Sequence, residues 1–228
     1  MMEEYYDFME NYGSKLAETH CRYLANQIYV ERLLPVDYIG LSIYFQTEFK
    51  RNANYEYASS LIWHFLKKEQ LYKANPFLLY SKPNVFADVI RYVQKDISER
   101  ETNHDIYNLL CNNHKAYVNK IEELCEELVD RFNFLGSPVI ASTIISLMTG
   151  WCPILHKKFI PFLLRTNNLS REFLTMIDTF SPLIEMGILT GMVEPNYRMI
   201  ILWQTILFLK KYYDNYHKND EIIYQFVK

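Results

Sequence analysis

Residues 135–148 read LGSPVIASTIISLM, and this stretch carries a complete set of helix-boundary signals. Gly136 suits the left-handed backbone conformation in which helical segments often end. Ser137 suits the N-cap of the next helix, because its hydroxyl can accept a hydrogen bond from a backbone N–H in the first turn. Pro138 suits the first helical position, where its missing N–H would have had no partner. The stretch therefore predicts a helix over 138–148, and it is the strongest boundary signal in the chain.

Upstream of this boundary, the clearest periodic pattern lies within residues 54–72. Apolar pairs recur four residues apart, at 57/58, 61/62 and 65/66. This spacing is typical of an α-helix that buries one face. Asn54 suits the N-cap of that helix, and we expect the helix to end near Tyr72.

The same reasoning predicts helices along almost the whole chain. The expected ranges are 14–34, 36–50, 54–72, a helix that begins at Pro76, 84–97, 106–132, 138–148, 154–166, 170–180, 182–191, 196–217 and 220–228. The range 106–132 is either one helix or two helices joined near Asn112-Asn113. The expected N-caps are Ser14, Asn54, Asn75, Asn84, Ser137, Ser170, Ser181 and Asn196.

No strand signal of convincing length occurs, and the chain has only 6 glycines. We therefore expect an all-α fold of stacked antiparallel helices, in irregular repeats of the HEAT or MIF4G kind. The boundary at Gly136 divides the chain into an N-terminal helical domain over 1–135, which would dock partners, and a C-terminal helical domain over 136–228.

Charge and hydropathy exclude several classes of partner. The 228 residues carry a formal net charge of −3, and the basic pairs at 67–68, 157–158 and 210–211 are isolated. Proteins that bind nucleic-acid phosphates usually carry a basic stripe, so we expect no direct nucleic-acid binding.

The apolar run 199–209 is shorter than the span of about 20 residues that a membrane helix needs. Residues 1–7 do not resemble a signal peptide, so we expect an intracellular protein with four reduced cysteines and no membrane contact.

Motifs for catalysis are scarce. Cys111 with His114, and Cys152 with His156, could together form a four-ligand zinc site, but their spacing matches no standard module, which favours core or surface roles. The chain has no nucleophile elbow, no P-loop and no G-x-G-x-x-G stretch. Carboxylate pairs four residues apart, at 122/126 and 123/127, lack the Glu-x-x-His partner motif of di-iron bundles. We therefore expect no enzyme activity, no cofactor and no metal.

Large aromatic residues offer two interpretations. Trp63, Trp151 and Trp203 lie in apolar stretches, which favours core packing. Tryptophan and tyrosine also dominate the energetics of protein interfaces. The sequence therefore offers four candidate partner contacts, which are Trp151, Tyr212, Tyr213 and Tyr216.

Several segments, in order, resemble subunit 11 of the Ccr–Not deadenylase complex. Residues 57–63 and 73–77 resemble the helix that ends in Ala-Asn-Pro-Phe in that family's N-terminal domain. Residues 137–148 resemble the start of its C-terminal helical domain, and 159–164, 168–174 and 197–209 continue the likeness. The motif residues, which we expect to be structural, are Ala74, Asn75, Pro76, Phe77, Ser137, Pro138, Ala141, Leu147 and Met148. Ser137 replaces the Asn that the family prefers, and helical residues 103–134 replace its long low-complexity linker, so the chain would be a short, linker-less member.

The resemblance implies a non-catalytic subunit for mRNA deadenylation and post-transcriptional regulation. Its implied partners are the scaffold subunit and the tetratricopeptide-repeat subunit of the complex, and the nucleases belong to other subunits. The implied location is the cytoplasm, with the nucleus as an additional site. The alternative is a viral Bcl-2-like bundle that inhibits apoptosis by holding an amphipathic helix in a groove. Length and helix count fit this alternative, but Thr149-Gly150-Trp151 stands where its Asn-Trp-Gly-Arg type of motif would be expected.

Overall fold

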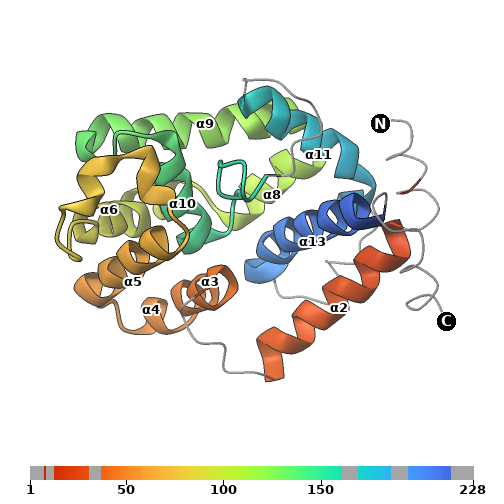
Figure 1. Cartoon of the computed structure of the whole chain (residues 1–228), viewed down its shortest axis with the longest axis horizontal. Helices are drawn as coiled ribbons and strands as arrows, with labels where there is room; N and C mark the ends of the chain where they lie inside the picture. The colour runs from red at the N-terminus through yellow and green to blue at the C-terminus, as the bar shows by residue number, and fades with distance from the viewer. Residues whose placement is uncertain (1–7, 9–12, 31–36, 161–168, 186–194, 217–228) are drawn as a thin grey trace.

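The computed structural model describes residue 8 and residues 13–30, 37–160, 169–185 and 195–216, and every regular element in these ranges is helical (Figure 1). The all-α prediction is therefore confirmed, and the HEAT or MIF4G type of repeat stays a prediction. The elements are α2 (Ser14–Val30), α3 (Tyr38–Gln46), α4 (Glu48–Arg51), α5 (Tyr55–Lys68), η2 (Leu71–Ala74), η3 (Pro76–Leu79), α6 (Ala87–Tyr92), η4 (Val93–Ile97), α7 (Ser98–Arg100), α8 (Asn103–Asn112), α9 (His114–Arg131), η5 (Asn133–Leu135), α10 (Pro138–Thr149), α11 (Leu169–Glu185) and α13 (Pro195–Tyr216). Among these described residues, no helix is both long and apolar enough to cross a membrane.

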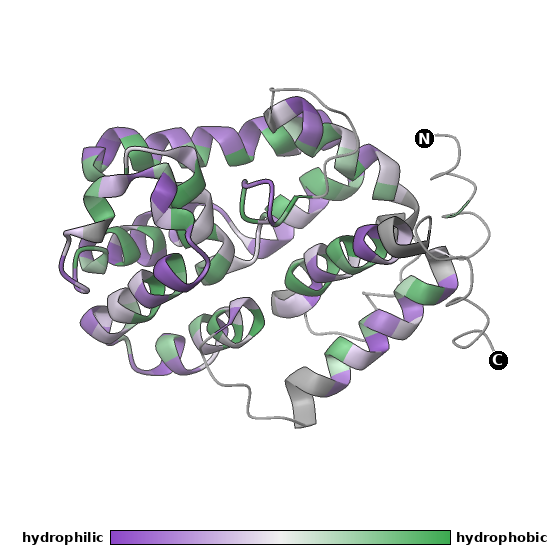
Figure 2. Ribbon diagram, in the orientation of Figure 1, coloured by the Kyte–Doolittle hydropathy of each residue, from purple (hydrophilic) through white to green (hydrophobic). Residues whose placement is uncertain are grey.

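Helix α10 is buried along nearly its whole length. It packs against α3 and α9, and all its residues from Ile140 to Thr149 are buried. Figure 2 shows hydrophobic residues on the faces that helices turn toward one another, and hydrophilic residues on the outer side of α9. Helices from 1–135 and from 136–228 share one hydrophobic core, because α10 contacts α3 and α9 while α13 contacts α2, α3 and α8.

The polar side chains of this buried helix have hydrogen-bond partners that connect it to its neighbours. The Ser146 hydroxyl donates to the Cys152 carbonyl at 2.6 Å and lies 2.8 Å from the Tyr38 hydroxyl. The Ser142 hydroxyl accepts a hydrogen bond from the Leu155 N–H at 3.0 Å. The Gln46 side chain donates to the Met148 carbonyl. Since a buried polar group without a partner costs about 1–3 kcal/mol, these bonds fix α3 and residues 152–155 against α10.

These bonds also explain an error in the predicted helix over 154–166. Residues 154–160 form bends and a turn instead of a helix, and the Leu155 N–H donates to the Ser142 side chain of α10 instead of to a helical carbonyl. The remainder of that predicted helix lies outside the described residues. The same holds for the predicted helix over 220–228 and for the expected end of the first helix near Leu34.

Three of the predicted N-caps, at Asn54, Asn75 and Ser137, are confirmed. The Asn54 side chain accepts a hydrogen bond from the Tyr57 N–H, and the Ser137 hydroxyl accepts one from the Val139 N–H. Two helices meet at Asn113, which caps α9, so the two-helix alternative for 106–132 is the observed one. Asn75 caps η3 as predicted, although η3 is a short 3-10 turn.

Other boundaries differ from the prediction. A break at Thr47 separates α3 from α4 within the predicted helix over 36–50, and α5 ends at Lys68 rather than near residue 72. Helix α6 begins at Ala87, where the Ser59 hydroxyl from α5 accepts a hydrogen bond from the Phe86 N–H, so Asn84 is not its cap.

Helix α11 runs through Ser181, so the predicted cap at this residue is wrong. Phe173, Ile177 and Phe180 form a continuous buried face along α11, and this packing outweighs the local stop signal. Ser170 likewise lies within the first turn of α11 rather than before it.

Helices α2 and α13 pack side by side, and His20 lies between them. Its ring stacks on Phe208 with centroids 4.1 Å apart, and its Nδ1 is 3.2 Å from the Thr205 hydroxyl. Burial lowers the pKa of His20 to about 4, because the charged imidazolium would lose water in this contact.

We predict that Phe65→Ala and Phe77→Ala differ sharply in their effect on stability. Phe65 is 2% exposed and Phe77 is 58% exposed, so the same substitution removes a core side chain in one case and a surface side chain in the other. Phe65→Ala should lower the unfolding free energy by about 3–5 kcal/mol, and Phe77→Ala should change it by less than about 0.5 kcal/mol, as measured by urea denaturation. Equal losses would contradict the described core.

We predict a pH dependence that arises from His20. The unfolded chain takes up a proton on this residue near its ordinary pKa of 6.5, whereas the folded chain does so only near 4. The stabilising effect of the neutral ring is therefore complete above pH 6.5 and is lost as the pH falls toward 4. The urea midpoint of the wild type should fall more between pH 7 and pH 5 than that of His20→Gln. Parallel declines would show that His20 titrates normally.

Candidate functional site

Two of the segments that carry the family resemblance, 73–77 and 137–148, lie next to each other, since η2 contacts α10. The Asn75 Nδ2 donates to the Phe134 carbonyl at 2.6 Å and to the Leu135 carbonyl at 3.0 Å, while its Oδ1 accepts a hydrogen bond from the Phe77 N–H at 3.1 Å. One side chain thus caps η3 and also bonds the end of η5, immediately before α10. We call this contact the motif junction.

Gly136 completes the motif junction. Its φ is +61°, in the left-handed region, and a Cβ built on it would lie 2.8 Å from the Asn75 Nδ2. That amide is held by two hydrogen bonds, so it can move only by losing them. Glycine at 136 therefore fits both the backbone conformation and the space.

The remaining motif residues around the junction have structural roles. The Ser137 side chain caps α10, and Pro138 occupies its first position. Ala141 and Leu147 are fully buried, and Met148 is nearly so. Ala74 is the last residue of η2, and Pro76 is the first of η3. Phe77 differs from all of these, because its ring is mostly exposed to solvent.

The four candidate partner contacts lie in different environments. Trp151 is 1% exposed, and its indole N–H donates to the Asn103 side chain, so it packs in the core as the first interpretation of the tryptophans expected. Tyr213 is buried against Phe8, and Tyr212 is half-buried. The side chain of Tyr216 lies outside the described residues. Burial arises because the apolar stripe of α13 continues through Tyr213.

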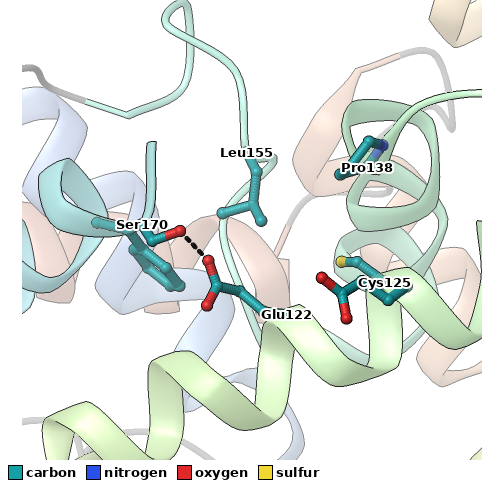
Figure 3. Close-up of a pocket in the computed structure, with 7 residues that line it drawn as sticks. Glu122, Cys125, Pro138, Leu155 and Ser170 are labelled. Carbon is teal, nitrogen blue, oxygen red and sulfur yellow. Dashed lines mark hydrogen bonds between the residues drawn. The ribbon is translucent and has the colours of Figure 1, made fainter. Parts of the chain in front are cut away.

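A small pocket lies between α9, the start of α10 and α11 (Figure 3). Its volume is about 160 Å³, below the range of about 300–1,000 Å³ that is usual for small-molecule sites. The Ser170 hydroxyl donates to the Glu122 carboxylate across it. Its lining residues are Glu122, Cys125, Glu126, Pro138, Leu155, Ser170 and Phe173.

The pocket holds no activated nucleophile. Burial raises the pKa of the Glu122 carboxyl, and the neighbouring Glu126 raises it further. Burial raises the pKa of the Cys125 thiol to about 12, and the two glutamates act in the same direction. Since the thiolate is the reactive form, this cysteine stays protonated and unreactive at neutral pH.

The four residues of the zinc site considered above, Cys111, His114, Cys152 and His156, lie in separate environments. His114 Nδ1 lies 2.7 Å from Asp178 Oδ1, and His156 Nδ1 accepts a hydrogen bond from the Lys158 N–H. Cys111 is half-buried, and Cys152 is fully buried beneath α10. Within the described ranges, no group of three or more His, Cys, Asp or Glu side chains could hold a metal ion.

One feature of the surface was missed by sequence reasoning. Phe77 and Tyr80 are 58% and 88% exposed, and they flank the end of η3 beside the motif junction. The available signal was the short distance between the predicted helix start at Asn75-Pro76 and the next predicted cap at Asn84, because so short an element offers little buried face.

Comparison of the chain with protein-family models, with curated proteins and with solved structures gives no significant match.

We predict that Asn75→Ala and Gly136→Ala are coupled. Asn75→Ala leaves two carbonyls without a donor, which should cost about 1–3 kcal/mol of unfolding free energy. Gly136→Ala should displace the Asn75 amide as well as strain the backbone. In the Asn75→Ala background only the strain remains, so the double variant should be more stable than the sum of the two losses by about 0.5–3 kcal/mol. A double-mutant cycle in urea measures this difference, and strict additivity would show that Asn75 and Gly136 do not interact.

Proposed function

We propose that this chain is a non-catalytic, protein-binding helical subunit of a Ccr–Not type of deadenylase complex. The observation that carries the proposal is the motif junction. Two of the segments that resemble the same family, 73–77 and 137–148, lie side by side, because η2 contacts α10 and the Asn75 side chain bonds to the Phe134 and Leu135 carbonyls just before Ser137.

The chemistry of the described side chains supports a role without catalysis. Burial raises the pKa of all four thiols, at Cys21, Cys111, Cys125 and Cys152. A nucleophilic cysteine needs the opposite shift. The pocket at Glu122 is smaller than most substrate sites and is closed across by the Ser170 hydrogen bond. These features favour binding through a surface over reaction in a cavity.

In this role the chain would dock on the scaffold subunit and on the tetratricopeptide-repeat subunit, and nucleases in other subunits would remove poly(A). The proposed location is the cytoplasm, with the nucleus as an additional site. Direct contact with RNA is not needed for such a subunit, which agrees with the net charge of −3.

Affinity purification of the tagged full chain from its native cell tests this proposal. We expect the scaffold, the tetratricopeptide-repeat subunit and the deadenylase nucleases to copurify in near-equal amounts. The purified chain alone should leave a poly(A) substrate intact over hours.

Two results would contradict the proposal. Recovery of short amphipathic-helix regulators of apoptosis, without the scaffold, would favour the Bcl-2-like alternative. Shortening of poly(A) by the purified chain, abolished when one of its own carboxylates is replaced, would make it an enzyme.

A further inference from the structure

Exposed aromatic and basic residues occur in and beside the 3-10 turn η3. We define the η3 surface as Trp63, Lys67, Lys73, Phe77, Tyr80 and Lys82. Phe77 and Tyr80 are two of the four large hydrophobic residues that are exposed in the part of the chain that the structure describes. Trp63 and Lys67 are half-buried at its edge, and Lys73 and Lys82 are exposed.

The backbone holds the two exposed rings on the same side of the turn. Residues three apart in a 3-10 helix lie nearly above one another, and the Tyr80 N–H donates to the Phe77 carbonyl at 3.1 Å. The Asn75 side chain caps the start of this turn and ties it to η5. The turn is therefore ordered before any partner arrives, which lowers the entropy cost of binding through it.

Side-chain contacts connect the turn to helix α5. The Trp63 indole N–H donates to the Ser81 hydroxyl at 3.3 Å, next to Tyr80 in the chain. The Lys67 ammonium lies 3.5 Å from the centre of the Trp63 ring, in a cation–π contact. Trp63 and Lys67 thus lie beside the segment that contains Tyr80 and Lys82.

The charge of this region is opposite to that of the whole chain. Residues 63–82 contain four lysines and one acidic residue, Glu69, in a chain whose net charge is −3. Glu69 forms an ion pair with Lys158. Lys67, Lys73 and Lys82 form no ion pair with any residue that the structure describes. The Lys73 ammonium donates to the Gln70 side chain at 2.7 Å, and the Lys67 ammonium lies over the Trp63 ring, but neither contact neutralises the positive charge that a negatively charged partner would meet.

We propose that the η3 surface binds an acidic linear segment of a partner protein that carries an aromatic or aliphatic anchor residue. The anchor would pack on Phe77 and Tyr80, and acidic residues beside it would pair with the three lysines. This inference rests on the proposed role as a protein-binding subunit, and it names one surface and the chemistry of its ligand.

The observations favour a peptide over single-stranded RNA. An RNA platform stacks successive bases on open aromatic faces along a basic track. Here Lys67 covers one face of Trp63, so only Phe77 and Tyr80 remain as free rings. Two rings and three lysines suit a short anchor segment better than a run of nucleotides.

Selection from a displayed library of random 16-residue peptides tests the proposal on the full chain. The selected peptides should be acidic and should share an aromatic or aliphatic residue. Their affinity, measured by fluorescence anisotropy, should fall by about 30-fold for Phe77→Ala/Tyr80→Ala, the loss expected from removing an interface hot spot. It should stay unchanged for Tyr23→Ala/Tyr57→Ala, which removes two exposed tyrosines elsewhere. Unchanged circular dichroism melts would show that both double variants fold.

The charge component has its own variant. Lys67→Gln/Lys73→Gln/Lys82→Gln should weaken the same peptides and reduce the salt dependence of their binding. Selection of neutral or basic peptides would overturn the proposal, as would equal affinity for the Phe77→Ala/Tyr80→Ala variant. Tight binding of a fluorescent 20-nucleotide poly(A) probe that depends on Phe77 and Tyr80 would replace the peptide by RNA.

Failure of this inference can be told apart from failure of the proposed function. Purification with the Phe77→Ala/Tyr80→Ala variant from the native cell should lose one partner that the wild type retains. If the variant recovers the whole deadenylase complex, the proposed function stands and the η3 surface is not its docking site. If even the wild type recovers no such complex, the proposed function itself is wrong.

Discussion

The rest of the structure depends on helix α10. Because this helix is buried, each of its polar side chains needs a hydrogen-bond partner inside the protein. Its residues from Ile140 to Thr149 are buried, yet four of them are Ser or Thr. Intrahelical hydrogen bonds satisfy Thr143 and Thr149, while Ser142 and Ser146 bond to Leu155 and Cys152 outside the helix. The outward bonds allow residues 152–155 to cross the core without forming a helix of their own. The core around α10 is thus specified by hydrogen bonds as well as by apolar packing.

The same helix positions the surface that we connect with function. Its N-terminal boundary, Gly136-Ser137, lies where the Asn75 side chain crosses to η5. The turn that carries the exposed rings of Phe77 and Tyr80 is therefore hydrogen-bonded through Asn75 to the residues directly before the buried helix α10. A turn anchored in this way presents a rigid surface to a partner, whereas a turn in a free loop would have to be ordered on binding.

How much the sequence predicts follows from the distance over which each structural cause acts. The side chains of Asn54, Asn113 and Ser137 each accept a hydrogen bond from a backbone N–H two or three residues later. Such short-range caps can be predicted from the local sequence. The start of α6 is set by Ser59, which lies 27 residues upstream, so Asn84 was a reasonable but wrong choice. In the candidate site, Asn75 and Gly136 were each identified as boundary residues, but only the structure brings them together. The exposure of Phe77 was not predicted, because an apolar residue in a motif usually packs inward.

Native-state hydrogen exchange of the full chain tests the central claim, that the buried helix α10 and its hydrogen bonds organise the fold. Amides within α10, from about Thr143 to Thr149, should exchange only through global unfolding and should be among the slowest in the protein, with opening free energies equal to the global unfolding free energy. Amides of α2, which packs mainly against α13, should open at lower free energy. Exchange of the α10 amides as fast as those of α2 would contradict the account.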